Sequence, residues 1–288
     1  MIDLPVKHRT ARVNGLRLHF VTAGQGPPLY LLHGYPQTWY MWRKMVPALA
    51  EKFSLVMPDL RGYGDSDKPK GGYDKRTMAQ DIRELARHLG HERFGLAGHD
   101  RGGRVAHRYA LDHGETLTGL CLLDILPTRT MFEHTDRRLA TGAWHWFFFL
   151  VPDLPELMIG AEPEAVIRYF CRTWAGDPTA IEEEAVQEYI RAFRLPGTIR
   201  GTLEDYRAGA SIDLEHDAQD EDKRIEVPLR IYWGGTGGVS GLFEPLAVWR
   251  EKATQVEGRA IETSGHFIPE EAPGELCGEL IPFFEGLS

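Results

Sequence analysis

Short apolar runs alternate with segments of helical periodicity along the first 125 residues of the chain. Strict alternation of apolar and polar residues at 16–22 (LRLHFVT) predicts a half-exposed edge or antiparallel strand. Continuous apolar runs, which suit strands buried on both faces of a parallel sheet, lie at 28–32, 53–57, 94–97 and 120–123. Helical patterns lie between the runs at 39–50, 76–89 and 101–112. This alternation predicts a doubly wound α/β sheet.

The pattern changes after residue 127, where helical segments rich in aromatic residues replace the strands. Strands are predicted again at 229–233 and 259–263, followed by a final helix at 272–284. Because the sheet pattern continues after the helical segment, we expect a helical cap inserted into a single core domain. The expected core consists of residues 1–126 and 211–288, and the expected cap of residues 127–210.

Composition narrows the range of partners. The 288 residues include 33 Lys and Arg against 42 Asp and Glu, which gives a formal net charge of −9. This acidic balance, without a Lys/Arg tract, argues against nucleic acid or an anionic membrane as a partner. It does not exclude a small anionic substrate, because distant surface charges are screened beyond about 8 Å at physiological salt.

The cysteine pattern and the N-terminus indicate a reduced, soluble, cytoplasmic protein. Cys121, Cys171 and Cys277 are odd in number and have no C-x-x-C spacing, so neither disulfides nor a zinc site is expected. The N-terminus has no apolar segment typical of a secretory signal. The most apolar run, 143–151, is much shorter than the roughly 20 residues that span a bilayer.

A glycine-flanked aspartate follows one of the apolar runs. Residues 94–104 read FGLAGHDRGGR, so a predicted strand leads through Gly98, Asp100 and Gly102 into a helix. This order resembles the nucleophile elbow of α/β-hydrolases, with Asp100 where serine often stands. A carboxylate is already ionised at neutral pH and suits displacement of a leaving group from saturated carbon. The resulting ester must then be cleaved by water, which requires a general base and an oxyanion hole.

Candidates for the base and its supporting acid lie at the ends of predicted strands. His266 in the sequence SGHF follows the last predicted strand, so it comes last in the nucleophile, acid, histidine order of this fold. The acid must orient the imidazole. The loop at 234–241 (GGTGGVSG) holds no carboxylate, so Asp124, at the end of the strand LCLL, is the expected acid. Glu244 is a weaker candidate and a helix-start residue.

The oxyanion hole and the substrate-binding groups are predicted from two further segments. The backbone N–H groups of Tyr35, in HGYP, and of Arg101 are expected to face the ester oxygen, while His33 packs within its loop. Arg101 and Arg104 share one face of the helix that follows Asp100, near its positively polarised N-terminus. Two guanidinium groups there are suited to bind a substrate carboxylate.

Together these motifs resemble the fluoroacetate dehalogenases, the haloacetate-hydrolysing branch of the α/β-hydrolases. The resemblance covers residues 9–284. Its motifs are HGYP at 33–36, DLRGYG at 59–64, GHDRGGR at 98–104, LDILPT at 123–128, WHWFF at 144–148, DYRAG at 205–209 and GHF at 265–267. HG-x-P and GHD-x-GG are shared with epoxide hydrolases, whereas GHDRGGR, WHW and DYRAG are more specific.

The resemblance implies a two-step reaction without metal or organic cofactor. Asp100 would displace the halide, and His266, supported by Asp124, would activate water. Arg101 and Arg104 would bind the substrate carboxylate. A halide pocket would be formed by His145, Trp146 and Tyr206. One departure is Tyr35, which stands where the family commonly has phenylalanine. A homodimer is compatible with the resemblance.

The expected function is hydrolysis of short 2-haloacids, and three other functions are alternatives on the same fold. A haloalkane dehalogenase is disfavoured, because those enzymes resemble one another in placing tryptophan where this chain has Arg101. An epoxide hydrolase is the main alternative; it needs two cap tyrosines, and Tyr169, Tyr189 and Tyr206 are available. A non-catalytic receptor on the same fold is disfavoured because all three triad residues are present.

Overall fold

The computed structural model describes residues 5–237 and 243–287. Eight strands form one sheet in the order β1-β2-β4-β3-β5-β6-β7-β8. β2 is antiparallel to both of its neighbours, and all other pairs are parallel. The strands are β1 (Lys7–Val13), β2 (Leu16–Ala23), β3 (Pro28–Leu32), β4 (Ser54–Pro58), β5 (Phe94–His99), β6 (Leu117–Leu123), β7 (Leu229–Gly234) and β8 (Val256–Ile261).

The predicted α/β sheet is confirmed, with one strand missed. β1 (KHRTARV) is mostly exposed and carries no apolar pattern, so periodicity gave no signal for it. The signal that was present is the Asn14-Gly15 pair, whose positive φ angles of 46° and 79° make the tight hairpin turn to β2. Of the two alternatives predicted for 16–22, the antiparallel strand is confirmed. The half-exposed edge is wrong, because β1 pairs with β2, which is an interior and largely buried strand.

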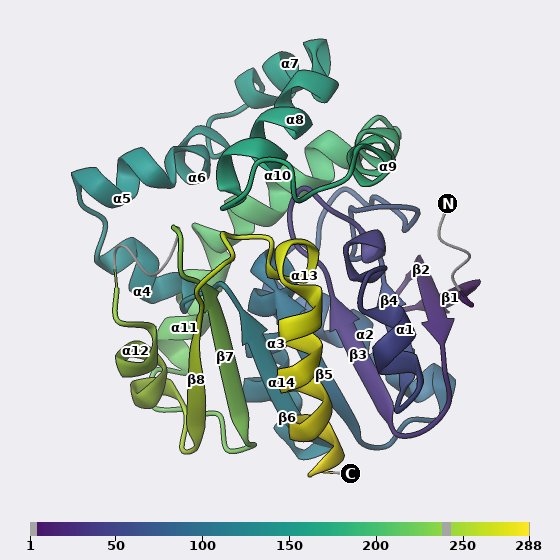
Figure 1. Cartoon of the computed structure of the whole chain (residues 1–288). Helices are drawn as coiled ribbons and strands as arrows, with labels where there is room; N and C mark the ends of the chain where they lie inside the picture. The colour runs from purple at the N-terminus through teal and green to yellow at the C-terminus, as the bar shows by residue number, and fades with distance from the viewer. Residues whose placement is uncertain (1–4, 238–242, 288) are drawn as a thin grey trace.

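Helices cover both faces of the sheet (Figure 1). α1 (Val46–Ala50) and α14 (Pro273–Glu285) lie on one face, while α2 (Lys75–Leu89) and α3 (Asp100–His113) pack together on the other. The helix predicted at 39–50 is divided into a 3₁₀ turn, η1 (Trp39–Trp42), and α1, which has a proline in its first turn. α12 (Pro245–Lys252) and the short α13 (Ile268–Glu271) complete the C-terminal part.

Between β6 and β7 every described element is a helix. Most of these helices form a separate layer above the carboxyl ends of the strands (Figure 1), as expected for an inserted cap. The exact cap boundaries at 127 and 210 remain a prediction. The helices are α4 (Thr128–Glu133), α5 (Arg137–Gly142), α6 (Trp144–Phe148), α7 (Leu154–Ala161), α8 (Pro163–Trp174), α9 (Glu183–Phe193), α10 (Thr198–Gly209) and α11 (Ile212–Gln219).

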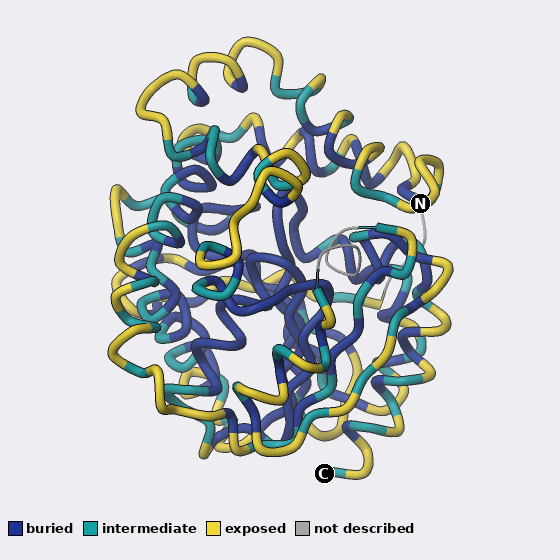
Figure 2. The backbone as a smooth tube through the Cα atoms, turned by 90° about the vertical axis from the view of Figure 1, so that its left-hand side faces the viewer, coloured by how far each residue is buried: buried dark blue, intermediate teal, exposed yellow. Residues whose placement is uncertain are grey.

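The central strands form the buried core, whereas the outer helical turns are exposed (Figure 2). The three cysteines are buried and unpaired, which confirms the prediction that they contribute no disulfide. Within residues 5–237 and 243–287, no helix is long and apolar enough to cross a membrane. The cytoplasmic location and the homodimer remain predictions.

Close backbone packing forms the turn between β5 and α3. A Cβ atom at Gly98 would lie 2.5 Å from the Gly102 carbonyl oxygen, and one at Gly102 would lie 2.3 Å from the His33 carbonyl oxygen. Neither position has room for a side chain. β5 therefore turns directly into α3 against the end of β3, and Asp100 stands at the apex with a left-handed φ of 47°. A non-glycine residue in this uncommon conformation is a candidate functional position.

Replacing Gly102 with alanine is expected to destabilise the protein, because the new methyl group would overlap the backbone at the end of β3. Overpacking of this kind costs about 1–3 kcal/mol, and we expect a loss at the upper end in urea unfolding. Gly278→Ala is the matched control. Nothing lies within 4 Å of its added Cβ in α14, so helix propensity should raise stability by about 1 kcal/mol. Equal unfolding midpoints for the two variants would contradict the packing argument.

Candidate active site

Asp100 is buried and is held by the predicted oxyanion loop. The Tyr35 N–H donates to Asp100 Oδ1 at 2.7 Å. The loop can approach this closely because Gly34 has no side chain; a Cβ there would lie 2.4 Å from the Asp100 Cβ. Arg101, the second predicted oxyanion donor, follows in the first turn of α3, where backbone N–H groups have no acceptor within the helix. Oδ1 is thus the oxygen fixed by the protein, and Oδ2 is the oxygen available for attack.

The surrounding charges keep the Asp100 carboxyl group ionised. Burial favours its neutral form, but His266 and Arg101 outweigh burial and lower its pKa below the ordinary value. An aspartate that stays charged in a site shielded from water is a competent nucleophile without proton transfer.

His266 and Asp124 form the predicted base–acid pair. The His266 Nδ1 lies 2.6 Å from Asp124 Oδ2. Asp124 Oδ1 accepts the Gly234 N–H at 3.0 Å, which fixes the carboxylate at the junction of β6 and β7. The other ring nitrogen, His266 Nε2, is buried without a partner among the described residues. Burial acts to lower the His266 pKa, but Asp124 outweighs it, so the pKa lies above the ordinary value.

Arg104 is a buried cation that forms no ion pair with an acid among the described residues. Its Nη1 donates to the Leu126 carbonyl at 3.0 Å and to Thr128 Oγ1 at 2.9 Å. The guanidinium lies 4.5 Å from the ring centre of Trp146, and its Nε has no hydrogen-bond partner in the part of the chain described. Burial, together with the nearby Arg101, lowers the Arg104 pKa to about 10, so the group still carries its charge at neutral pH.

Arg101 is placed differently from Arg104. Its Nε and Nη2 donate to Asp205 Oδ2 and Oδ1 at 3.0 and 2.7 Å, and Nη2 also reaches the Asp205 carbonyl. Lys75 and Tyr63 bind the same carboxylate. Arg101 is therefore ion-paired with Asp205 through Nε and Nη2, and its use together with Arg104 to bind a substrate carboxylate remains a prediction. The Asp205 pKa is lowered, since Arg101 and Lys75 outweigh its burial.

The three residues predicted to bind halide lie together. Tyr206 on α10 contacts both His145 and Trp146 of α6, with ring centres 5.7 and 6.4 Å apart. The Tyr206 hydroxyl and His145 Nδ1 are buried and lack partners among the described atoms. Burial lowers the His145 pKa to about 3, so its imidazole is neutral.

The tyrosines considered for an epoxide hydrolase are dispersed. Tyr169 is 42% exposed on the cap, and the Tyr189 hydroxyl donates to Glu270 at 2.5 Å. Only Tyr206 lies beside the nucleophile. The phenol that accompanies it comes from the core: Tyr35 is fully buried, its ring centre is 5.5 Å from that of Tyr206, and its hydroxyl has no partner in the described structure.

A pocket of about 890 Å³ connects this site to the surface between cap and core. Its lining includes six predicted side chains: Asp100, Arg104, Asp124, His145, Trp146 and His266. Arg101 and Tyr206 are not part of the lining. α5 contributes the exposed Arg137 and Arg138, so cationic side chains occur both inside the pocket and where α5 borders it.

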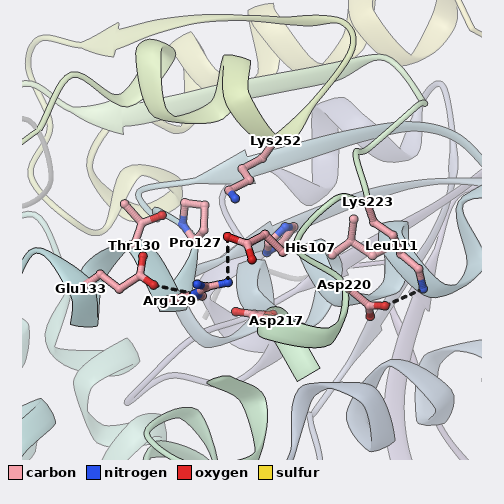
Figure 3. A pocket seen from close by; sticks show the side chains of 11 residues that line it. His107, Leu111, Pro127, Arg129, Thr130, Glu133, Asp217, Asp220, Lys223 and Lys252 are labelled. Atoms are coloured by element: carbon pink, nitrogen blue, oxygen red, sulfur yellow. Dashed lines mark hydrogen bonds and ion pairs between the residues drawn. The ribbon is translucent and has the colours of Figure 1, made fainter. Parts of the chain in front are cut away.

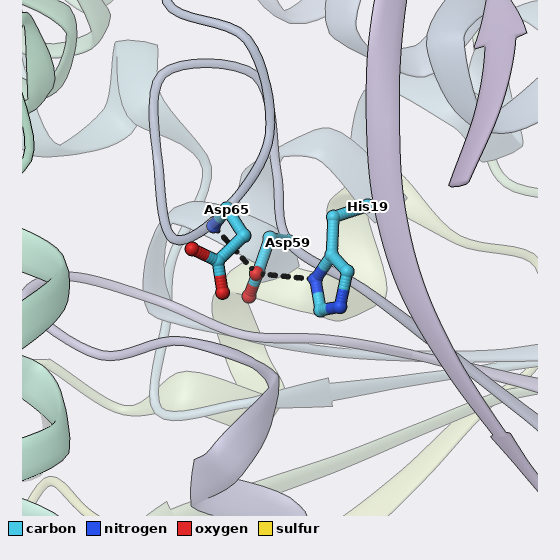
Figure 4. A group of neighbouring side chains, drawn as sticks. All are labelled: His19, Asp59 and Asp65. Carbon is cyan, nitrogen blue, oxygen red and sulfur yellow. Dashed lines mark hydrogen bonds and ion pairs between the residues drawn. The ribbon is translucent and has the colours of Figure 1, made fainter. Parts of the chain in front are cut away.

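Other clusters of ionisable groups are already occupied by structural contacts. His19, Asp59 and Asp65 lie within reach of one ion (Figure 4). Asp59, however, accepts His19 Nδ1 at 2.7 Å and the backbone N–H groups of Asp65 and Trp39. In the second such group, Asp74 caps α2 and Asp213 binds Lys75. The carboxylates of both groups thus accept hydrogen bonds from neighbouring segments, whereas Nδ1 of His216, the third member of the second group, has no partner among the described residues.

A smaller cavity, about 60 Å³, lies beside α4 and α11 (Figure 3). Several of its charges are paired, Arg129 with Glu133 and Lys223 with Asp220. His107 also lines it, and burial lowers the pKa of that imidazole to about 3. The cavity contains no side chain resembling an activated nucleophile, so the larger pocket is the candidate active site.

The structure also contains site residues that the sequence did not reveal. Asp205 lies within the motif DYRAG, but nothing in the sequence indicated its pairing with Arg101. Glu270 and Glu271 follow the phenylalanine of GHF by three and four residues. Glu270 binds the Arg43 guanidinium, and Glu271 accepts the Gly265 N–H in residues 265–267, the loop that carries His266 and is called the catalytic loop below. Two minor predictions are confirmed: His33 Nδ1 bonds the Gly34 carbonyl within its own loop, while Nε2 accepts the Leu60 N–H of the segment after β4, and Glu244 immediately precedes α12. Residues 238–242 of the loop after β7 lie outside the described residues.

Known proteins that are similar in sequence or structure share this fold. A family model described as the alpha/beta hydrolase fold matches residues 27–273. A soluble epoxide hydrolase of Corynebacterium sp. (strain C12) is 42% identical, covering 98% of each chain. A fluoroacetate dehalogenase of a Burkholderia species is 40% identical, covering 96% of this chain and 93% of its own. An α/β-hydrolase structure from Nostoc sp PCC 7120 superposes with a TM-score of 0.94 at 47% identity, covering 96% of this chain and 97% of its own. The chain therefore belongs to the α/β hydrolase fold family.

Proposed function

We propose that this α/β-fold hydrolase removes halide from short 2-haloacids, with fluoroacetate and chloroacetate as first substrates. The products are the 2-hydroxy acid, glycolate in these cases, and a halide ion. The reaction has two steps at the Asp100 carboxylate: an ester forms as halide leaves, and water then hydrolyses that ester. We propose that the residues around Asp100 supply the groups for both steps.

In the first step Asp100 Oδ2 attacks the carbon that carries the halogen, and the carbon–halogen bond breaks as the ester bond forms. The Tyr35 N–H keeps Oδ1 in place, so only Oδ2 is free to react. The departing halide needs donors in place of water. His145, Trp146 and Tyr206 are proposed to receive it, which gives a role to the unpartnered Tyr206 hydroxyl.

In the second step water attacks the carbonyl carbon of the ester. His266 Nε2 takes the water proton, and Asp124 stabilises the imidazolium formed. Negative charge develops on Oδ1, which already accepts the Tyr35 N–H. Collapse of the intermediate releases the hydroxy acid, whose leaving oxygen takes the proton held by His266, and the second proton of the attacking water passes to solvent as the Asp100 carboxylate is restored.

The observation that carries this proposal is the buried Arg104, which lines the pocket together with Asp100 and forms no ion pair with an acid among the described residues. Burying an unpaired charge is costly, and a substrate carboxylate would supply the missing anion. A neutral epoxide or haloalkane would not. Arg101 is proposed to assist chiefly through its charge, because Asp205 occupies its Nε and Nη2.

Epoxide hydrolysis is the second candidate, and one observation favours it. The buried phenols of Tyr35 and Tyr206 lie side by side with unpartnered hydroxyls. Two such donors are suited to protonate an opening oxirane oxygen after attack by Asp100. The similarity to the Corynebacterium soluble epoxide hydrolase supports this candidate as much as the Burkholderia dehalogenase supports the first.

Halide release measured with an ion-selective electrode separates these candidates. Wild-type protein is expected to release fluoride from fluoroacetate and chloride from chloroacetate, and Asp100→Asn is expected to release neither. The exposed variant Asp67→Asn serves as the matched control and should behave as wild type. Diol formation from styrene oxide without halide release from either acid would overturn the proposal in favour of the second candidate.

The His266→Asn variant should separate the two chemical steps. Without the base, Asp100 still displaces halide but the ester persists, so one halide is released per chain and the protein gains the mass of one carboxymethyl group. Intact-protein mass spectrometry with chloroacetate measures this gain, and peptide mapping should locate it at Asp100. His134→Asn, on the exposed cap surface, is the control and should show full turnover. An unmodified His266→Asn protein after prolonged incubation would show that the steps are assigned incorrectly.

Arg104→Met should selectively impair acid substrates. Hydrogen bonds to charged groups are worth about 1.5–3 kcal/mol, so kcat/KM for chloroacetate should fall about tenfold to hundredfold. Chloroacetamide, which lacks the negative charge, should be affected much less. Arg194→Met, which removes an exposed ion pair with Glu164, is the control. An equal loss for acid and amide would mean that Arg104 does not recognise the carboxylate.

A further inference from the structure

Glu271, at the end of α13, joins the catalytic loop to the cap through one carboxylate. Its Oε2 accepts the backbone N–H groups of Gly265 at 3.0 Å, Gly176 at 2.7 Å and Asp177 at 3.3 Å. Its Oε1 accepts the Phe267 N–H at 2.9 Å. Two of these amides flank His266 in the core, and the other two belong to the cap segment between α8 and α9.

The amide between the two core donors is also fixed by the cap. His266 N–H donates to the Trp174 carbonyl at 2.9 Å, so three consecutive amides of the catalytic loop are bound by Glu271 and Trp174. The two backbones are in direct contact here. A Cβ at Gly265 would lie 2.3 Å from the Gly176 nitrogen. The two loop backbones are therefore packed too closely to leave room for a side chain between them.

This contact places the base relative to groups that come from the cap. The Trp174 ring lies edge-on to His266, with ring centres 5.3 Å apart, and its centre is 4.6 Å from that of His145. The Asp124 hydrogen bond holds His266 only through Nδ1. The main-chain position, which determines where Nε2 points, depends on the amides that Glu271 and Trp174 bind and on the His266 carbonyl, which lies 2.7 Å from His99 Nε2.

We propose that Glu271 is a positioning residue for the second chemical step: it fixes the His266 main chain and couples it to cap residues 174–177. This inference rests on the proposed two-step function. The first step uses Asp100, Tyr35 and the halide-binding side chains, none of which contacts Glu271 among the interactions described. Loss of Glu271 is therefore expected to slow ester hydrolysis and to leave ester formation nearly unchanged.

The test is Glu271→Gln, which keeps the shape of the side chain. Its amide group has one acceptor oxygen instead of two and cannot bind both sets of backbone N–H groups. Rapid-quench mass spectrometry with chloroacetate measures the rates of ester formation and ester loss separately. Ester loss should slow about tenfold or more, since small displacements of a catalytic group have effects of this size, while ester formation stays within about twofold. Esterified protein should accumulate in the steady state.

The controls separate this inference from its alternatives. Glu275→Gln, on the exposed first turn of α14 where Glu275 pairs with Arg259, should leave both rates unchanged. Glu271→Asp retains the charge but is one methylene shorter; it should show the same selective defect in milder form and serves if Glu271→Gln does not fold. Equal slowing of both steps, or no slowing, would overturn the positioning role. Absence of any ester or halide in the wild type would instead reject the proposed function.

Discussion

The close backbone contact around Asp100 is the constraint on which the rest of the site depends. Glycine at 34, 98 and 102 allows β3, β5 and α3 to meet at distances that no side chain would permit. The result is a buried carboxylate at the apex of a tight turn, with the Tyr35 N–H on one oxygen. A buried carboxylate without compensation would take up a proton. The nearby positive groups of α3 and the catalytic histidine prevent this, so the turn and the site charges are mutually dependent.

The cap and the core meet at a second set of buried charges, on α13. Glu270 is fully buried and binds the Arg43 guanidinium at 2.7 Å and the Tyr189 hydroxyl of the cap. The adjacent Glu271 binds backbone amides of the cap and of the catalytic loop. The Arg43–Glu270 pair lies within the core and reaches the cap through the Tyr189 hydroxyl and through Glu182, which binds Arg43 at 3.1 Å. These contacts hold the cap against the core beside Asp100. The pocket is thereby maintained between two parts of the chain that are distant in sequence.

Local signals in the sequence predicted most of the sheet and pointed to Asp100, Asp124 and His266, which line one pocket. Apolar runs marked the buried strands, and glycine-flanked Asp100 and the SGHF motif stood where this fold places a nucleophile and a base. The signals failed where structure depends on a distant partner. β1 lacks an apolar pattern because it is an exposed edge, and the sequence cannot show that Asp205 forms an ion pair with Arg101. The roles of Glu270 and Glu271 were missed for the same reason.

Haloacid and epoxide hydrolysis share the covalent step at Asp100 and differ in what surrounds it. The unpaired Arg104 favours an acid, and the phenols of Tyr35 and Tyr206 favour an oxirane. Both depend on Asp100 acting as the nucleophile rather than as a base for water. A single turnover with excess enzyme in ¹⁸O-labelled water tests this directly. The account predicts unlabelled oxygen in the new hydroxyl group of the product and label in the Asp100 carboxylate. Label in the product hydroxyl after the first turnover would contradict it.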